Sequence, residues 1–236
     1  DALRAYYEQA GILIARPAGG TSCRLAISAK GGTNAENHNH NDVGSYAVAL
    51  GSETMVGDQG GPNSYPGDYF NGDAPQKYKI KGSFGHPVPV VDGRTQSSGG
   101  KAKGVVLQKE FTNEKDVFSI DYTSAYSTPN LDKLIRTFVY DRQGKGSFTV
   151  GDEFTAKIPI RFETAITTRA DWKVLDDTHL LLATDSEQMI VAIDASGKVA
   201  FTSETIEVNS PAYTRIGIAL KNQSKEGYIR LKMYTK

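Results

Sequence analysis

The sequence predicts an all-β fold, a large antiparallel β-sandwich made of two stacked sheets. Strand-length runs rich in Val, Ile, Thr and Tyr recur at short intervals, and clusters of Gly, Ser, Asn and Asp separate them. Strands spaced in this way favour a sandwich over βαβ units. Hydrophobic residues make up 39% of the chain, a modest share that suits strands with one face in water.

The elements follow in order along the chain. Ala2 to Gln9 is one short helical candidate, and almost all of the rest reads as strands. The strand candidates, in chain order, are GILIARP, SCRLAISAK, GSYAVAL, GVVLQKEF, DVFSIDYTSAY, KLIRTFVYD, SFTVGDEFTA, FETAITT, HLLLATD, MIVAIDA, RIGIALK and YIRLKMYT. TMVGD is a further strand, paired with GSYAVAL through a tight turn at Gly51 and Ser52. We interpret residues 1–236 as a single domain.

One segment, Gln59 to Gly100, breaks this rhythm because it is rich in Gly, Pro, Ser and Asn. A long irregular segment inside a compact domain is usually either functional or disordered. Its aromatic residues, among them Tyr65, Tyr69 and Tyr78, argue against disorder, since disordered tracts contain few aromatic side chains. We therefore predict an ordered loop system that carries a site.

The overall composition points to no particular class of charged partner, although a local patch can still bind a polyanion. Lys plus Arg and Asp plus Glu balance at 27 each, so the net charge favours neither nucleic acid nor an anionic membrane. The chain has no apolar run long enough for a transmembrane helix. Cys23 is the single cysteine, which excludes an internal disulfide and a cysteine-based zinc finger, and we interpret it as a small core residue.

Two histidines one residue apart, His38 and His40, stand out in a chain with only four histidines. If they lie on an extended strand, both imidazoles project from one face. Asp58 ends the same stretch, and His86 lies at the far end of the irregular segment. Two histidines and one carboxylate suit zinc, with water or substrate in the remaining position, whereas calcium and magnesium prefer oxygen ligands. An acid/base site and a polar turn without chemistry are the alternatives.

Several further polar residues fit a simple structural role as well as a functional one. Asp42 and the neighbouring Asn side chains are candidates to fix a histidine tautomer, although Asp42 equally suits a turn cap. His179 begins an apolar strand, and we assign it no role in a site. The sequence contains neither a GxSxG elbow nor a phosphate-binding glycine loop.

At this point the motifs resemble a known family. HNHNDVGSYAVALGSETMVGDQGGPNSY resembles the HxHxDxxSF…D.G..SY signature of the heparinase II/III-like polysaccharide lyases. GHPVPVVDGRTQ resembles the family's later block, and YYEQAGILIAR resembles the strand that enters the domain, so the match spans Tyr6 to about Gln96. The resemblance implies a β-sandwich domain that normally follows a helical (α/α) toroid, with the active site in the cleft between the two.

The resemblance also implies roles for single residues. His38 matches the catalytic histidine that reaches the substrate. Tyr65, in the SY element, and Asn37 are the candidate substrate-binding residues. The residues that match the metal ligands, usually of a structural zinc ion, are His40, Asp58 and His86.

The implied reaction is β-elimination on a polysaccharide that contains uronic acid, of glycosaminoglycan or alginate type. His38 would help to neutralise the sugar carboxylate, and an imidazole can also move a proton near neutral pH. A periplasmic or secreted location follows from the size of such a substrate.

The family's tyrosine acid/base resides on the helical toroid, which this strand-rich chain does not contain. We therefore expect a C-terminal fragment, inactive alone, whose partners are an acidic polysaccharide and the missing helical domain. The alternative is a non-catalytic carbohydrate-binding or structural β-sandwich. A cupin-like metal enzyme ranks last, because no Glu follows the histidine pair at the cupin spacing.

Overall fold

Alternation of apolar and polar residues decides which face each strand buries. In β11 (Leu131–Asp141), the side chains of Leu134, Phe138 and Tyr140 are buried, and the residues between them are more exposed except at Arg136. Successive side chains of a strand point to opposite faces of its sheet, so this spacing gives β11 one apolar face. The same logic produces the layers of the whole molecule.

The computed structural model describes residues 2–58, 61–208 and 210–236, and every strand pair in these ranges is antiparallel. The eight-stranded sheet has the order β14 (Asp171–Asp176), β15 (His179–Ala183), β16 (Gln188–Ala195), β19 (Ser224–Thr235), β12 (Ser147–Ile160), β11, β10 (Lys115–Asp121) and β9 (Val105–Phe111).

The remaining strands form three smaller sheets. The five-stranded sheet has the order β1 (Arg4–Tyr7), β2 (Ile12–Ala15), β3 (Leu25–Lys30), β5 (Tyr46–Leu50) and β6 (Glu53–Val56). The four-stranded sheet has the order β17 (Val199–Val208), β18 (Ser210–Leu220), β13 (Phe162–Thr168) and β7 (Val90–Val91). The two-stranded sheet pairs β4 (Thr33–Asn34) with β8 (Gly99–Lys103).

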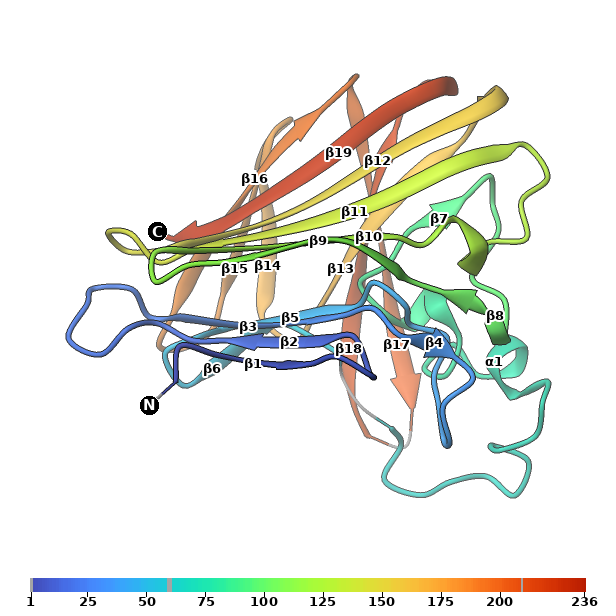
Figure 1. Ribbon diagram of the computed structural model, residues 1–236, viewed down its shortest axis with the longest axis horizontal. Coiled ribbons are helices and arrows are strands. Elements are labelled where there is room, and N and C mark those ends of the chain that lie inside the picture. The colour runs from blue at the N-terminus through green and yellow to red at the C-terminus, as the bar shows by residue number, and fades with distance from the viewer. Residues whose placement is uncertain (1, 59–60, 209) are drawn as a thin grey trace.

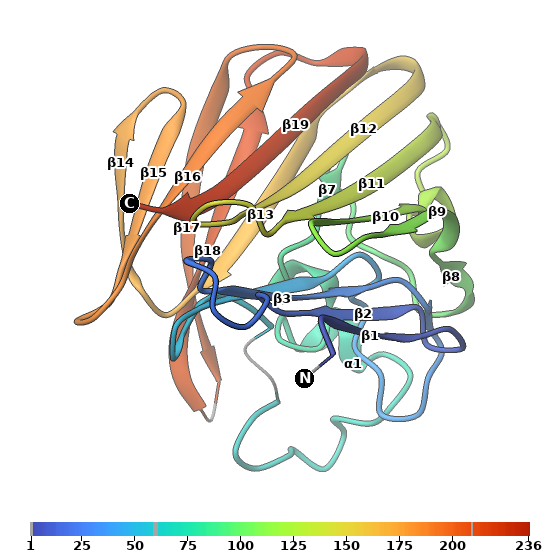
Figure 2. The ribbon, with the colours of Figure 1, turned by 60° about the vertical axis from the view of Figure 1, so that its left-hand side comes forward.

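The eight-stranded sheet forms one layer of the sandwich, and the five-stranded and four-stranded sheets pack against it (Figure 1, Figure 2). Between β5 and β12 the rings of Tyr46 and Phe148 lie 5.9 Å apart, and between β12 and β13 those of Phe154 and Phe162 lie 4.6 Å apart. The predicted all-β sandwich is thus confirmed, and each quoted strand candidate contains or overlaps an observed strand.

The helix predicted over Ala2–Gln9 is wrong, because this stretch contributes β1, the edge strand that pairs with β2. Arg4 donates from Nε to the carboxylate of Asp116 at 2.8 Å, and the Tyr6 ring lies 5.7 Å from that of Phe118. Both partners belong to β10, so contacts with the opposite sheet override the local helical pattern.

The described part of the irregular segment, residues 61–100, contains only short elements before β8 begins. These are α1 (Ala74–Lys77), the 3₁₀ turn η1 (Ser83–Gly85) and β7, while residues 59 and 60 lie outside the described residues. Tyr69 and Ile80 of the segment are buried against Ile206 and Tyr213 of the four-stranded sheet. In the described part of the chain, no helix has the length and apolar character required to cross a membrane.

A buried guanidinium joins these layers. Arg136 is 0% exposed and binds both carboxylate oxygens of Asp152, at 2.7 and 2.6 Å. Its Nη1 donates to two loop carbonyls, those of Gly44 and Pro87, at 2.7 Å each. Its Nη2 also donates at 3.0 Å to the hydroxyl of Thr164 on β13, which in turn donates to Asp152. One side chain of β11 therefore connects the main sheet, β13 and two loops.

We predict that Asp152→Ala lowers the free energy of unfolding by about 3–5 kcal/mol, because it leaves the Arg136 charge buried without its counter-ion. Glu153→Ala is the matched control: Glu153 pairs with Arg230 on the exposed side of the same strand, where an ion pair contributes less than about 1 kcal/mol. Urea denaturation of both variants measures the difference, and equal losses would contradict the role given to Arg136.

Candidate functional site

Three segments that are distant in the sequence meet around His40, Asp58 and His86. His40 lies in the loop between β4 and β5, Asp58 follows the end of β6, and His86 directly follows η1. One potential ligand atom from each residue lies within 4.8 Å of the others. The structure thus brings together the three residues predicted as metal ligands, and occupancy by an ion stays a prediction.

The segments that carry Asp58 and His86 are both anchored on the four-stranded sheet. The backbone N–H of Gly57 donates to the carbonyl of Thr167 at 3.0 Å, and the Thr167 hydroxyl donates back to the Gly57 carbonyl. The Tyr213 hydroxyl donates to the carbonyl of Gly85 at 2.9 Å. These contacts fix the backbone on either side of the candidate site.

His86 fits a cation particularly well. Its side chain is 1% exposed, and its Nε2 lies 3.0 Å from the carbonyl of Ile80, to which it donates. That leaves Nδ1, buried without a hydrogen bond in the described residues, 3.3 Å from a carboxylate oxygen of Asp58. A lone pair and a carboxylate repel each other unless a proton or a metal cation lies between them. Burial alone would lower the pKa of His86, but the Asp58 carboxylate outweighs burial and raises it.

His40 is held in the neutral form that a metal requires. Burial, followed by the proximity of His86, lowers its pKa to about 4. Its Nε2 lies 3.2 Å from the hydroxyl of Tyr69, whose pKa burial raises to about 12, so that this hydroxyl stays protonated. In the tautomer with the proton on Nε2, His40 donates to the Tyr69 oxygen and its lone pair on Nδ1 is left for an ion, the arrangement usual for a ligating histidine.

Gln96 locks the loop that carries both histidines. Its side-chain amide both donates to and accepts from the backbone of Val43, and it also accepts from the amide of Asn34. Asn41 donates at 3.3 Å to the Gln96 carbonyl and at 3.0 Å to the hydroxyl of Ser98. The amide nitrogen of Asn41 therefore holds the loop to the segment after β7, and the role of Asn side chains in fixing a histidine tautomer stays a prediction.

Asp42 lies at the turn before β5. Its backbone carbonyl accepts the N–H of Ser45 at 2.9 Å, and its buried carboxylate accepts a hydrogen bond from the ammonium of Lys30. The turn contact agrees with the turn-cap interpretation of this aspartate. Its negative charge also acts to raise the pKa of His40 and of His86, and a role in fixing a histidine tautomer stays a prediction.

His38 departs from the strand geometry considered for the HxH pair. Residues 35–41 form a loop in which the N–H of Asn39 closes a turn onto the carbonyl of Glu36 at 3.2 Å. His38 itself has a φ of 56°, in the left-handed region that a residue other than glycine seldom adopts. The pair therefore does not lie on the extended strand from which both imidazoles would project on one face. His38 is exposed, and its ring lies 4.5 Å from that of Phe70.

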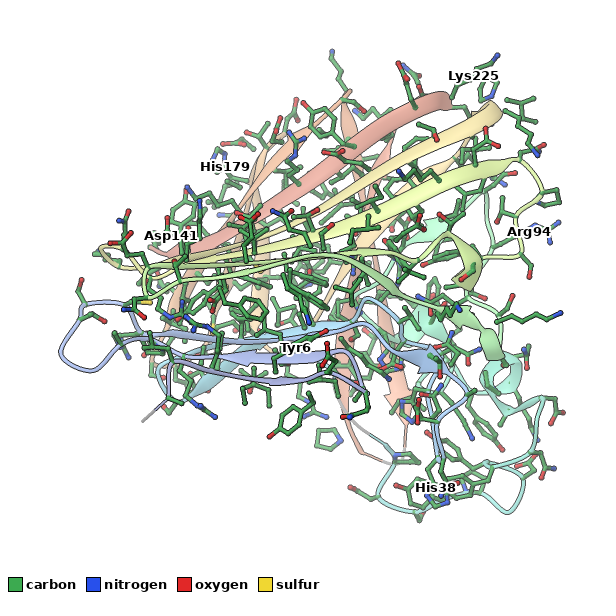
Figure 3. The ribbon with its side chains drawn as sticks, viewed as in Figure 1. Tyr6, His38, Arg94, Asp141, His179 and Lys225 are labelled. Carbon is green, nitrogen blue, oxygen red and sulfur yellow. The ribbon has the colours of Figure 1, made fainter. Side chains whose placement is uncertain are left out.

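The other predicted substrate-binding residues lie near His38. Tyr65 is 57% exposed, and its ring is 5.1 Å from that of Phe70, which in turn contacts His38. Asn37 is exposed on the same turn as His38. Figure 3 shows His38 among the side chains of the irregular loops, far from Lys225 at the opposite end of the molecule. Their roles toward a substrate stay predictions.

Sequence reasoning left four residues of this region without a role: Tyr69, Phe70, Lys81 and Arg136. The aromatic residues of the irregular segment, Tyr69 among them, served only as an argument against disorder, and the structure buries Tyr69 while it leaves Phe70 exposed. The sequence carries no comparable signal for Lys81 or Arg136. Only their burial in the structure distinguishes them from other lysines and arginines of the chain.

Features elsewhere in the described residues offer weaker candidates. His179 forms an exposed turn contact with Asp176, 3.0 Å from its carboxylate, and does not approach the other histidines. A surface depression of about 640 Å³ lies over β11, β12 and β19. The arginine that lines it, Arg230, is already paired with Glu153 and Asp194. Among these features, the cluster of His40, Asp58 and His86 is therefore the strongest candidate for a functional site.

Neither a protein-family model nor a curated protein matches the sequence. Solved structures do match. Heparan sulfate lyase HepC from Pedobacter heparinus superposes with a TM-score of 0.78 at 14% identity, over 100% of this chain and 37% of that one. A heparinase III structure superposes with a TM-score of 0.76 at 17% identity, over 98% of this chain and 36% of that one.

The comparisons therefore show the class of fold, a β-sandwich like the one in the matched heparan sulfate lyase. More specifically, the fold is the one that these heparinase III and HepC structures contain, and the resemblance noticed in the sequence motifs is supported by the whole chain. The chain spans little more than a third of the length of those lyases.

We predict that zinc stabilises the protein through the three clustered residues. A ligand at 100 times its Kd adds about 2.7 kcal/mol, which corresponds to a rise of about 5–10 °C in Tm for a chain of this size. His86→Ala should abolish the rise, and His179→Ala, the matched control, should keep it. Thermal melts with and without zinc measure the effect. A rise of the same size in the His86 variant would place the ion elsewhere.

Proposed function

We propose that the chain is the β-sandwich module of a polysaccharide lyase, which cleaves a polysaccharide containing uronic acid by β-elimination. The observation that carries the proposal is the cluster of His40, Asp58 and His86. The exposed histidine His38 lies on the same loop as His40. The shared fold supports it, since one matched structure is of a heparan sulfate lyase. Glycosaminoglycan is accordingly favoured as the polymer over alginate.

The reaction makes definite demands on the protein. The proton on C5 of the uronate leaves to a base, its electron pair forms the C4–C5 double bond, and the bond from C4 to the bridging oxygen breaks as that oxygen takes a proton. The carboxylate next to C5 must be neutralised for the proton to become acidic enough. An exposed imidazole can hydrogen-bond such a carboxylate and can move protons near neutral pH, and we assign these tasks to His38.

The metal has a separate task in this proposal. His40, Asp58 and His86 would hold zinc, and the bound ion would supply the positive charge that cross-links the His40 loop with the segments after β6 and η1. No proton transfer is assigned to these three residues. Their contribution is to keep the loop with His38 in one place, because the distance between His38 and His40 along the chain is only two residues.

The remaining catalytic groups are assigned to a helical domain. The proposed partners of the chain are thus this helical domain and the acidic polysaccharide. This assignment is supported by the share of the matched lyases that the chain covers, about 37%. A periplasmic or secreted location fits a polymer substrate.

The partial coverage also favours a second candidate, a carbohydrate-binding module without catalysis. Such a module would bind acidic oligosaccharides as tightly after His38→Ala as before, and it would release no unsaturated product. The lyase proposal requires His38 for turnover, so a single variant separates the two functions.

We predict that the protein encoded by the full gene releases unsaturated uronate, measured as a rise in ultraviolet absorbance, and that His38→Ala lowers the rate about 10²–10⁴-fold. His179→Ala should retain the parental rate, since this histidine contacts only an exposed turn. Parental activity in the His38 variant would remove His38 from the mechanism. Absence of any product from the parent would contradict the lyase proposal.

A further inference from the structure

Three lysines follow one another at every second position in the segment around α1 and η1, and they differ in how their charge is balanced. Lys77 pairs with Asp68, and Lys79 pairs with Glu204. Lys81 has no carboxylate partner among the described residues, although it is the most buried of the three, at 6% exposure. Burial of a charge is costly unless another charge compensates it.

The surroundings of Lys81 compensate its charge only in part. Its ammonium donates to the backbone carbonyl of Tyr69, and it lies 4.8 Å from the ring centre of Tyr69 and 4.9 Å from that of Phe70. A carbonyl dipole and two aromatic faces attract a cation but do not neutralise it. Burial accordingly lowers the pKa of Lys81. A positive charge without a counter-ion therefore lies beneath these rings.

One of the two rings next to this charge, Phe70, is exposed on the surface together with its neighbour Tyr65, whereas the Tyr69 ring is buried. Phe70 is 48% and Tyr65 57% exposed, and their centres are 5.1 Å apart. The exposed imidazole of His38 lies next to Phe70. Large exposed aromatic side chains that cluster at one place usually mark a binding site. The C–H groups on one face of a sugar ring carry a slight positive charge and pack against the negative face of an aromatic ring.

We infer that Tyr65, Phe70 and Lys81 form a subsite that selects an acidic sugar residue over a neutral one. The two rings pack against the sugar, and the ammonium attracts its anionic group. Direct contact with the ammonium is not required, because the field of a charge without a counter-ion extends over several ångströms in a poorly screened environment. This inference rests on the proposed function, since it names the group that recognises the acid of the same substrate.

The experiment is isothermal titration calorimetry of the 236-residue chain with three hexasaccharides. One alternates glucuronate and N-acetylglucosamine without sulfate, one is the sulfated heparan counterpart, and one contains only neutral N-acetylglucosamine. Lys81→Met should weaken binding of the acidic probes about tenfold relative to the neutral one. Lys79→Met, the matched control from the same segment, should leave the preference unchanged. The two acidic probes distinguish a carboxylate from a sulfate as the group recognised.

Two further variants separate charge from packing. Lys81→Arg keeps the charge and should retain the acidic preference, whereas Phe70→Ala should weaken all three probes alike. Circular dichroism and Tm verify that each variant is folded. If Lys81→Met unfolds, Lys81→Arg tests whether the charge at this position causes the acidic preference.

The outcomes are distinct. Loss of acidic preference in Lys81→Met, or its retention in Lys81→Arg when the methionine variant is unfolded, supports the inference. Unchanged preference in a folded Lys81→Met, or its loss in Lys81→Arg, overturns the inference and leaves the lyase proposal intact. If the parent chain shows no preference for acidic probes, the inference is overturned, and the release of unsaturated product by the full-length protein then judges the lyase proposal separately.

Discussion

The buried ion pair between Arg136 and Asp152 joins the two loops that carry the histidines of the candidate site. A guanidinium has five N–H groups in a fixed plane, and here they bind two carboxylate oxygens, a hydroxyl and two backbone carbonyls. The two carbonyls belong to Gly44 and Pro87, four residues after His40 and one residue after His86. The strands of the main sheet therefore set the distance between the two histidine-bearing loops.

Such an arrangement answers a general difficulty of sites built on loops. Loops are mobile because few of their backbone groups have partners, yet a metal centre needs its ligands within a few tenths of an ångström. In this protein the loop with His40 is tied by Gln96 and Asn34, and the loop with His86 is tied through Gly85 to Tyr213. Two of the side chains that attach these loops, Asn34 on β4 and Tyr213 on β18, come from strands, so the rigidity of the sheets extends to the candidate ligands.

How much the sequence could predict follows from where the determining contacts lie. Alternating runs and turn signals predicted the sandwich and most strands, because that information is local. β1 was misassigned because a contact that holds it, from Arg4 to Asp116, joins residues more than 100 positions apart. β17 was not among the strand candidates, because polar residues interrupt its apolar ones. The candidate metal ligands were recognisable by residue type. The unbalanced charge of Lys81 can be recognised only from the structure, which shows that Lys77 and Lys79 form ion pairs with carboxylates.

His38 and His40 are only two residues apart, yet the rule that such residues share one face of a strand does not hold for them. On a regular strand, residues two apart share a face, and both imidazoles would point toward one ion. The left-handed backbone at His38 breaks that rule, and such a conformation costs of order 1–3 kcal/mol in a residue other than glycine. The surrounding contacts must offset this cost: the turn from Glu36 to Asn39 closes on one side, and the Phe70 ring packs on the imidazole. The strain separates the two imidazoles, so that one faces the buried cluster with His86 and the other stays exposed to solvent, where a polymer can reach it.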